Sequence, residues 1–288
     1  MKMHGAGNDF VVLDALVQSL PDDLSSLAKE LCRRPFGIGA DQLLVVRRGN
    51  LTPFFMEIYN ADGSRVEMCG NGVRCFLHYL QLKGHLKNDK VDVETPAGVV
   101  CPQIINDHPK ASSQQMWIKV DMGEPILEAQ KIPFVTQNGI CKQALDLDLK
   151  SRFPTDPLSV IVTAVSMGNP HAVIFVDDAA NYPVLRVGAA LEYHEAFPER
   201  VNVEFVQVEN RCRLLQRTWE RGVGETYACG SGACATLVAG VLNDLCDRQA
   251  VVVLRGGELD IFWDEVSNHV FQTGPSEIVF EGRMQHAF

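Results

Sequence analysis

Short runs of alternating apolar and polar residues recur along the chain and predict a strand-rich protein. The runs are rich in Val, Ile and Thr, and turn signals separate them. The clearest expected strands cover residues 91–100, 116–123, 158–165, 171–176, 201–208 and 213–219. Gly256-Gly257 and Ser267-Asn268 are typical of hairpin turns. Residues 141–157 show no clear pattern and predict a loop with a short helix.

Three segments instead show the spacing of apolar residues that predicts helices. Two of them, residues 73–84 and 233–245, directly follow glycine-rich turns. The third covers residues 24–31, and either Asp22 or Asp23 before it can cap its N-terminus.

Composition and charge exclude several classes of protein. The 288 residues are 46% hydrophobic and 22% charged, as in ordinary globular domains. A net charge of −10 disfavours a nucleic-acid binder, which needs a basic face. No apolar run reaches the roughly 20 residues of a membrane helix, and the N-terminal residues do not resemble a signal peptide. We therefore expect a cytoplasmic protein with neither a nucleic-acid nor a membrane partner.

The chain has nine cysteines, and the odd number without an export signal predicts reduced thiols. No C-x-x-C motif occurs, and the close pairs do not have the spacing of common zinc sites, so no metal is expected. Most of the cysteines are expected to be small buried residues. These are Cys32, Cys75, Cys101, Cys141, Cys212, Cys234 and Cys246.

A Cys-Gly-x-Gly pattern occurs twice, each time before an expected helix. The copies begin at Cys69 and Cys229, 160 positions apart (229 − 69). Matched polar residues recur at nearly the same separation, which indicates an internal duplication. They are Gly7-Asn8 with Gly168-Asn169, Gln42 with Asn202, and Asn60 with Glu220.

The duplication predicts two pseudo-symmetric, strand-rich halves of ordinary domain size. The half that carries Cys69 is expected to comprise residues 1–113 and 273–288, and the half that carries Cys229 residues 114–272. The predicted fold class is α/β, of the α+β type. Facing halves would place equivalent groups on opposite sides of one cleft, where we expect the active site.

A pair of thiols on opposite faces of one carbon is what a two-base inversion of stereochemistry needs. One thiolate removes the proton, and the opposing thiol delivers another. Each cysteine stands where a helix should begin, and the helix dipole there is expected to lower the thiol pKa from about 8.5. The neighbouring backbone N–H groups can hold a carboxylate.

At these residues the sequence resembles the diaminopimelate epimerases, amino-acid epimerases that use no pyridoxal phosphate. The resemblance implies two pseudo-symmetric domains, each a strand-rich sheet wrapped around a central helix. The matching segments are HGAGNDF (4–10), GADQ (39–42), YNADGSRVEMCGNGVRC (59–75), GNPHAV (168–173), RVNVEF (200–205) and WERGVGETYACGSGACA (219–235).

The resemblance also implies roles for individual residues. Cys69 and Cys229 would be the catalytic pair, and His171 and Glu220 would help to set their protonation. The residues expected to bind substrate are Asn8, Gln42, Asn60, Asn169, Asn202, Glu220 and Arg221, with the backbone amides of Gly70, Asn71, Gly230 and Ser231. Asp9, Asp41 and Asp62 are interpreted as turn and backbone-bonding residues.

The expected reaction is the interconversion of LL- and meso-2,6-diaminopimelate, a step toward lysine and peptidoglycan precursors, without a cofactor. The substrate is a small amino acid with two zwitterionic ends. Arg221 suits the distal carboxylate, because its planar guanidinium can donate to both oxygens. Glu220 can accept from an ammonium group. A homodimer is the default expectation for an oligomer.

Other functions stay open on the sequence alone. A racemase of another amino acid, such as histidine or glutamate, could use the same scaffold. The related phenazine-biosynthesis isomerases lack the cysteine pair and are disfavoured. A thiol redox protein or a metal-binding protein would use the same cysteines differently, and a structural or interaction module would have no thiol of unusual reactivity. A pyridoxal phosphate enzyme is disfavoured, because no lysine lies in a recognisable cofactor motif.

Overall fold

The computed structural model describes residues 1–112, 114–136, 139, 141–147 and 158–284. It divides into two compact units, Met1–Asp121 with Thr273–Phe288, and Met122–Gln272. The division expected from the sequence lies at residues 113/114. The difference is one strand, Gln115–Asp121, which pairs within the first unit.

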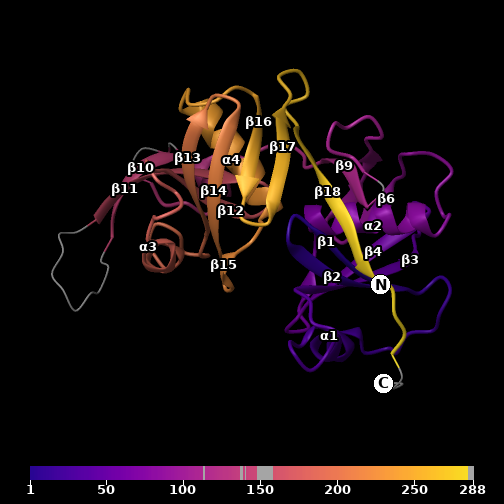
Figure 1. The fold of residues 1–288 in the computed structure, drawn as a ribbon. Coiled ribbons are helices and arrows are strands. Elements are labelled where there is room, and N and C mark those ends of the chain that lie inside the picture. The colour runs from indigo at the N-terminus through magenta and orange to yellow at the C-terminus, as the bar shows by residue number, and fades with distance from the viewer. Residues whose placement is uncertain (113, 137–138, 140, 148–157, 285–288) are drawn as a thin grey trace. The chain divides into compact units, whose positions relative to one another are not determined.

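The first unit contains two helices and the first nine strands of the chain (Figure 1). Its elements are β1 (Lys2–Gly5), β2 (Asn8–Asp14), α1 (Leu24–Cys32), β3 (Gln42–Arg48), β4 (Phe54–Asn60), β5 (Arg65–Val66), α2 (Gly70–Leu82), β6 (Val93–Thr95), β7 (Gly98–Val100), β8 (Gln103–Ile104) and β9 (Gln115–Asp121). The last strand of the chain, β18 (Val270–Phe280), pairs with β1 and β9.

The second unit is built in the same way. Its elements are β10 (Lys142–Leu147), β11 (Leu158–Ser166), β12 (Pro170–Phe175), α3 (Val184–Glu192), β13 (Asn202–Asn210), β14 (Arg213–Glu220), β15 (Gly224–Thr226), α4 (Gly230–Leu242), β16 (Gln249–Leu254) and β17 (Gly257–Trp263). A short 3₁₀ helix, Ala129–Lys131, precedes them.

The pairing of strands repeats between the units. In the first, β1–β2 is antiparallel, β2–β3 parallel, β3–β4 antiparallel, β4–β6 parallel and β6–β7 antiparallel. In the second, β11–β12, β12–β13, β13–β14, β14–β16 and β16–β17 follow the same order of directions. A helix connects the strands of each parallel pair in both units, as parallel connections require. The repeated topology supports the duplication inferred from the sequence.

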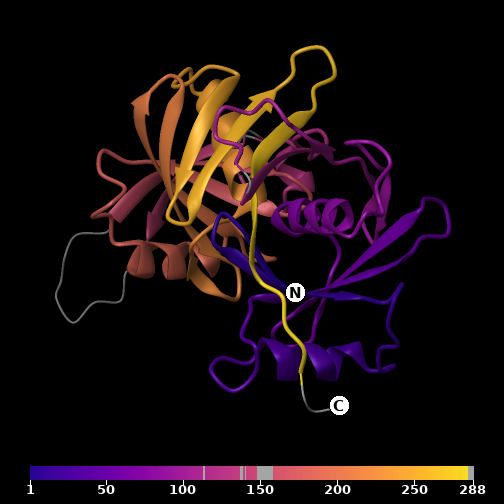
Figure 2. The ribbon, with the colours of Figure 1, turned by 45° about the vertical axis from the view of Figure 1, so that its right-hand side comes forward.

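Each unit has one helix on either face of its sheet. In the first, α1 packs on β3 and β4, whereas α2 contacts β1, β2, β3, β4 and β9. Figure 2 shows α1 and α2 as separate coils with strands between them. In the second unit, α3 covers one face and α4 contacts β11, β12, β13, β16 and β17. The predicted central helices are confirmed.

The three expected helices are present, and each begins within a turn of the position that the sequence predicted. Asp23 caps α1 by accepting from the Ser26 N–H at 3.0 Å. Cys69 and Cys229 are the N-cap residues of α2 and α4. The expected loop at residues 141–157 is wrong for its first part, because β10 pairs there with β11. Residues 148–157 lie outside the described residues.

Of the cysteines expected to be buried, Cys75 and Cys234 are fully enclosed in the helices, and Cys32 and Cys246 are also buried. Cys101 and Cys141 are only partly buried. Cys212 was misassigned, because the turn between β13 and β14 exposes it. Among the residues that the structure describes, no helix has both the length and the apolar character that a membrane crossing requires.

Candidate active site

Cys69 lies at the start of α2 in the first unit, and its sulfur faces the helix. The Gly72 N–H donates to Sγ at 3.4 Å, and the thiol donates to Asn8 Oδ1 at 3.6 Å. The side chain is partly exposed. The thiol is therefore at the positive end of the helix dipole, where the Cys-Gly-x-Gly pattern predicted it.

Three neighbours fix the orientation of the Asn8 amide. Its Oδ1 accepts from Asn71 Nδ2 at 3.3 Å, and its Nδ2 donates to Asp41 Oδ2 at 2.9 Å. Fully buried Arg74 donates to Asn71 Oδ1 at 2.6 Å. Asp41 also accepts from the Asp9 N–H, as a backbone-bonding residue should. Sequence reasoning missed its second role, which is to orient an amide beside the thiol.

Gln42 and Asn60 contact each other across β3 and β4, where their backbones are paired. Gln42 Nε2 donates to Asn60 Oδ1 at 2.9 Å, and Asn60 Nδ2 donates to Ser64 Oγ at 3.0 Å. The buried Gln42 Oε1 accepts no hydrogen bond from the described residues. It is thus an acceptor of the kind that a substrate ammonium group needs.

Cys229 is the corresponding cap of α4 in the second unit, and it is only 6% exposed. Burial raises its pKa well above the ordinary thiol value, and the charges of Glu220 and Glu204 raise it further. Hydrogen bonds from Ser231 and Gly232 act in the opposite direction but are weaker. The expected lowering by the helix is therefore wrong for Cys229, because desolvation of a thiolate outweighs it. This cysteine is held as a thiol.

His171 and Glu204 form a buried pair next to Cys229. His171 Nδ1 and Glu204 Oε1 are 2.8 Å apart, and both side chains are 0% exposed. His171 Nε2 lies 3.1 Å from Asn169 Oδ1. Sequence reasoning missed Glu204. The sequence does point to it, because it is a charged residue two positions after Asn202, on the same face of an otherwise apolar strand.

Asn202 links strand β13 to the loop that carries Arg221. Its Nδ2 donates to the Pro170 carbonyl at 2.9 Å, and its Oδ1 accepts from the Arg221 N–H at 3.0 Å. The register that pairs Val203 with Trp219 places Asn202 opposite Glu220. The second unit thus gathers the predicted residues Asn169, His171, Asn202, Glu220 and Cys229.

Arg221 and Glu220 follow one another at the end of β14. The exposed Arg221 guanidinium donates from Nη1 to the Glu199 carbonyl at 3.0 Å. An arginine has five N–H donors, so this bond leaves capacity for a carboxylate. Glu220 Oε1 accepts from Thr226 Oγ1 at 2.5 Å.

The first turns of α2 and α4 supply backbone donors. The first intrahelical bonds at these ends run from Val73 N to Cys69 O and from Ala233 N to Cys229 O. The N–H groups of the preceding helical residues have no carbonyl partner within the helix. Gly70, Asn71, Gly230 and Ser231 are among these residues, so each helix can bind a carboxylate there.

One group of three potential metal ligands occurs within the described ranges. A ring nitrogen of His171, an oxygen of Glu204 and Sγ of Cys229 lie within 4.8 Å of one another. The 2.8 Å separation of His171 Nδ1 and Glu204 Oε1 is a hydrogen-bond distance. Neighbouring ligands of a tetrahedral zinc ion would be roughly 3.3 Å apart. The geometry therefore fits a shared proton better than a metal ion.

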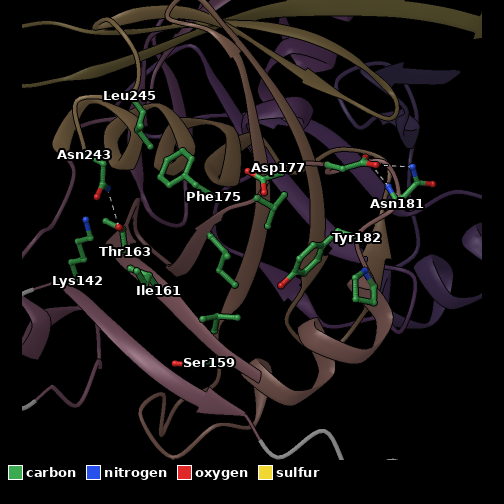
Figure 3. Close-up of a pocket in the computed structure, with 15 residues that line it drawn as sticks. Lys142, Ser159, Ile161, Thr163, Phe175, Asp177, Asn181, Tyr182, Asn243 and Leu245 are labelled. Carbon is green, nitrogen blue, oxygen red and sulfur yellow. Dashed lines mark hydrogen bonds between the residues drawn. The ribbon is translucent and has the colours of Figure 1, made fainter. Parts of the chain in front are cut away.

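A cavity of about 630 Å³ opens elsewhere in the second unit, between β10, β11 and the end of β12. Figure 3 shows Lys142, Asp177 and Tyr182 around it, and Asn243 hydrogen-bonded to Thr163 in its wall. None of the residues predicted for the active site lines this cavity. It is therefore separate from the candidate site.

Known proteins of one family are similar to this chain over nearly its whole length. The chain matches the family model described as diaminopimelate epimerase over residues 1–128 and 163–279. It is 45% identical over 282 residues to the diaminopimelate epimerase of Moorella thermoacetica, covering 98% of this chain and 97% of the relative. It is 46% identical over 288 residues to that of Desulforapulum autotrophicum, with coverage of 99% and 98%.

Solved structures with low sequence identity share the fold. A predicted epimerase from Pseudomonas aeruginosa has a TM-score of 0.66 at 16% identity, over 99% of this chain and 98% of that one. A probable proline racemase from Agrobacterium radiobacter has a TM-score of 0.63 at 15% identity, over 99% and 92%. These likenesses confirm the predicted fold class. The family model and the relatives of about 45% identity show that the chain belongs to the diaminopimelate epimerase family.

Proposed function

We propose that the protein is a diaminopimelate epimerase that interconverts the LL and meso forms of 2,6-diaminopimelate with a pair of cysteines. Its relatives of about 45% identity carry this name over nearly the full length of both chains. The observation that carries the mechanism is the repeated position of the thiols. Cys69 and Cys229 each cap the central helix of one of two units with the same topology.

The thiols act as base and acid in turn. In one direction Cys69, as thiolate, takes the α-proton, and the C–H electron pair remains on the α-carbon. Cys229, which is held as a thiol, delivers its proton to the opposite face. A new C–H bond forms as the S–H bond breaks, and the two cysteines have exchanged protonation states. The reverse reaction uses them in the opposite roles.

The carbanion needs stabilisation while the proton is absent. Its charge spreads into the α-carboxylate, which the N–H groups of Gly70, Asn71, Gly230 and Ser231 would bind. Donors that are already in place act most strongly where charge develops in the transition state. The chemistry requires no electron sink other than this carboxylate, so we propose that the enzyme uses neither a metal nor an organic cofactor.

The remaining polar groups suit the two zwitterionic ends of the substrate. Asparagine and glutamine amides both donate and accept, which lets them distinguish ammonium from carboxylate. Asn8 and Asn202 are each fixed by two or more hydrogen bonds. Arg221 would bind the distal carboxylate, and Glu220 would accept from an ammonium group.

We further propose a cytoplasmic location and a homodimer. Free cysteines throughout the described chain suit a reducing compartment. Light scattering of the purified protein tests the dimer by its mass.

A substrate panel tests the reaction. Reduced enzyme is incubated with LL-diaminopimelate, L-histidine or L-glutamate, and the stereoisomers are separated by chiral chromatography. We expect conversion of LL-diaminopimelate to the meso form and no racemisation of the other two. Racemisation of histidine or glutamate without action on diaminopimelate would reassign the substrate on the same scaffold.

A further inference from the structure

The two units differ at one position beside their capping cysteines. Phe10 pairs with Gln42 across the parallel strands β2 and β3. In the second unit, His171 pairs with Asn202 across the corresponding strands β12 and β13. Gln42 and Asn202 are the matched amides of the sequence repeat. An aromatic hydrocarbon side chain in one unit thus corresponds to an ionisable ring in the other.

A second difference accompanies the first. Two residues after the matched amide stands Leu44 in β3 and Glu204 in β13. The side chains of Phe10, Leu44, His171 and Glu204 are all 0% exposed. The same two positions of the repeated topology therefore hold two apolar residues in the first unit and two ionisable residues in the second.

The first unit shows that the fold does not require the ionisable pair. Burying two ionisable groups is costly, and apolar residues of similar size usually serve stability as well or better. A Cβ at Gly72 would lie 3.4 Å from a Phe10 ring carbon. A Cβ at Gly232 would collide with Glu204 Oε1 and lie 3.2 Å from Cys229 Sγ. The carboxylate thus packs against the first turn of α4, next to the thiol.

The hydrogen bonds fix the number of protons on the pair. The amide oxygen of Asn169 can only accept, so His171 Nε2 carries a proton. Another proton lies in the 2.8 Å contact between His171 Nδ1 and Glu204 Oε1. The pair is therefore neutral as a whole. Glu204 Oε2 accepts no hydrogen bond from the described residues, so His171 is the partner that balances the carboxylate.

We propose that Glu204 is a positioning residue that keeps His171 protonated beside Cys229 and so stabilises the Cys229 thiolate formed during turnover. The sulfur, a ring nitrogen and a carboxylate oxygen lie within 4.8 Å of one another. When the Cys229 proton moves to the substrate α-carbon, the shared proton remains on Nδ1, and the cation faces the new anion. Two carboxylates oppose the thiolate by their charge, Glu220 of β14 and Glu204 itself. The proton held on His171 is what offsets the charge of Glu204.

This role rests on the proposed function, and the variant Glu204→Gln tests it. Glutamine keeps the size of the side chain and can still accept from Nδ1–H, but it carries no charge. Without the counter-charge, the buried ring loses its second proton at lower pH. We expect the alkaline limb of the kcat/KM profile to move down by about one pH unit or more. On that limb, kcat should be about tenfold below the wild-type value at the same pH, with little change in KM. Glu204→Asp should restore part of the loss.

Nitrogen NMR of ¹⁵N-histidine-labelled protein measures the protonation of the His171 ring nitrogens directly, and it does not require catalytic activity. The signals of His171 are assigned by their absence in His171→Gln. At about pH 7.5, where an ordinary imidazole has lost its second proton, we expect both ring nitrogens of wild-type His171 to carry protons. In Glu204→Gln, one of them should not. A protein without diaminopimelate epimerase activity would refute the proposed function, and the ring comparison would still decide the role of Glu204.

The matched control is Glu57→Gln, which removes another buried carboxylate. Glu57 lies on β4 and binds Tyr59, Arg47 and Arg65. We expect this variant to keep the wild-type alkaline limb. The same ring protonation in wild type and Glu204→Gln, with an unmoved alkaline limb, overturns the proposed role. Loss of activity at every pH without a change in the ring also overturns it, because that is what a purely structural residue would show.

Discussion

The side-chain oxygen of Asn202 accepts a hydrogen bond from the backbone N–H of Arg221 at 3.0 Å. The same side chain donates to the Pro170 carbonyl at 2.9 Å. One amide therefore connects β12, β13 and the loop after β14. The backbone of that loop positions the proposed ligand of the distal carboxylate.

Asn202→Ala should weaken both stability and substrate binding. It leaves the Arg221 N–H and the Pro170 carbonyl without their partner, which costs about 1–3 kcal/mol in the free energy of unfolding. We expect KM to rise more than kcat falls, because the loop that binds the distal end is released. Urea unfolding and steady-state kinetics measure the two effects. An unchanged KM in a folded variant would separate Asn202 from substrate binding.

Arg221→Lys tests the distal carboxylate more selectively. Lysine keeps the charge but cannot form two parallel hydrogen bonds with a carboxylate. We expect KM for diaminopimelate to rise about tenfold or more, as for the loss of a charge-assisted hydrogen bond, while the unfolding free energy stays within about 0.5 kcal/mol. Equal kinetics of the two proteins would show that another group binds that end.

Buried thiols should make stability depend on alkaline pH. Burial raises the pKa of Cys75 to about 12, from the 9.0 expected in an unfolded chain. Above pH 9 the unfolded state loses this proton while the folded state keeps it, so stability falls as pH rises. For Cys75 the loss is about 1.4 kcal/mol per pH unit once pH exceeds 9. Urea unfolding at pH 8 to 11 should show a shallower decline in Cys75→Ala. An equal fall of the unfolding free energy in wild type and Cys75→Ala would show that Cys75 does not contribute to it.

Oxidation should inactivate the enzyme reversibly. The proposed mechanism brings both thiols to the same carbon, so in the absence of substrate they can approach closely enough to form a disulfide. We expect diamide to abolish activity and dithiothreitol to restore it, with a Cys69–Cys229 peptide found by mass spectrometry. Cys212→Ser, which removes the exposed thiol, is the control and should be equally sensitive. Full activity of the cross-linked protein would refute the mechanism.

The pH profile of turnover should be bell-shaped, because the reaction needs one thiolate and one thiol. The acidic limb reports formation of the thiolate. The alkaline limb reports loss of the protons that the second unit must hold. Burial raises the pKa of Cys229, and the proposed role of Glu204 keeps the shared proton on His171. A rate that keeps rising to the highest pH at which the protein stays folded, with no alkaline limb, would show that no thiol proton is required.

Local patterns predicted much of the fold and the reactive residues. The Cys-Gly-x-Gly turns placed Cys69 and Cys229 at helix starts because glycine and an N-cap signal are properties of a few adjacent residues. The repeat of Gln42 as Asn202 reflected the common topology of the units. Contacts between segments far apart in the sequence could not be predicted from local patterns. His171 and Glu204 are 33 residues apart in sequence and meet through the parallel pairing of β12 and β13.

The direction of the Cys229 pKa shift could not be predicted from local patterns either. The helix start favours a lowered pKa, and sequence alone gives no measure of the burial that reverses it. Glu220 and Glu204 add their effect only once β13, β14 and α4 have packed together. Strand β10 was also missed, since a polar strand is recognisable mainly by its pairing with β11.

Proton exchange tests the two-thiol mechanism most directly. Reduced enzyme, Cys69→Ser and Cys229→Ser are each incubated with LL- or meso-diaminopimelate in D₂O and followed by NMR. The wild type should incorporate deuterium at the α-carbon while it interconverts the isomers, and both variants should lose interconversion. Wild-type interconversion in either serine variant would contradict the claim that both cysteines carry the proton.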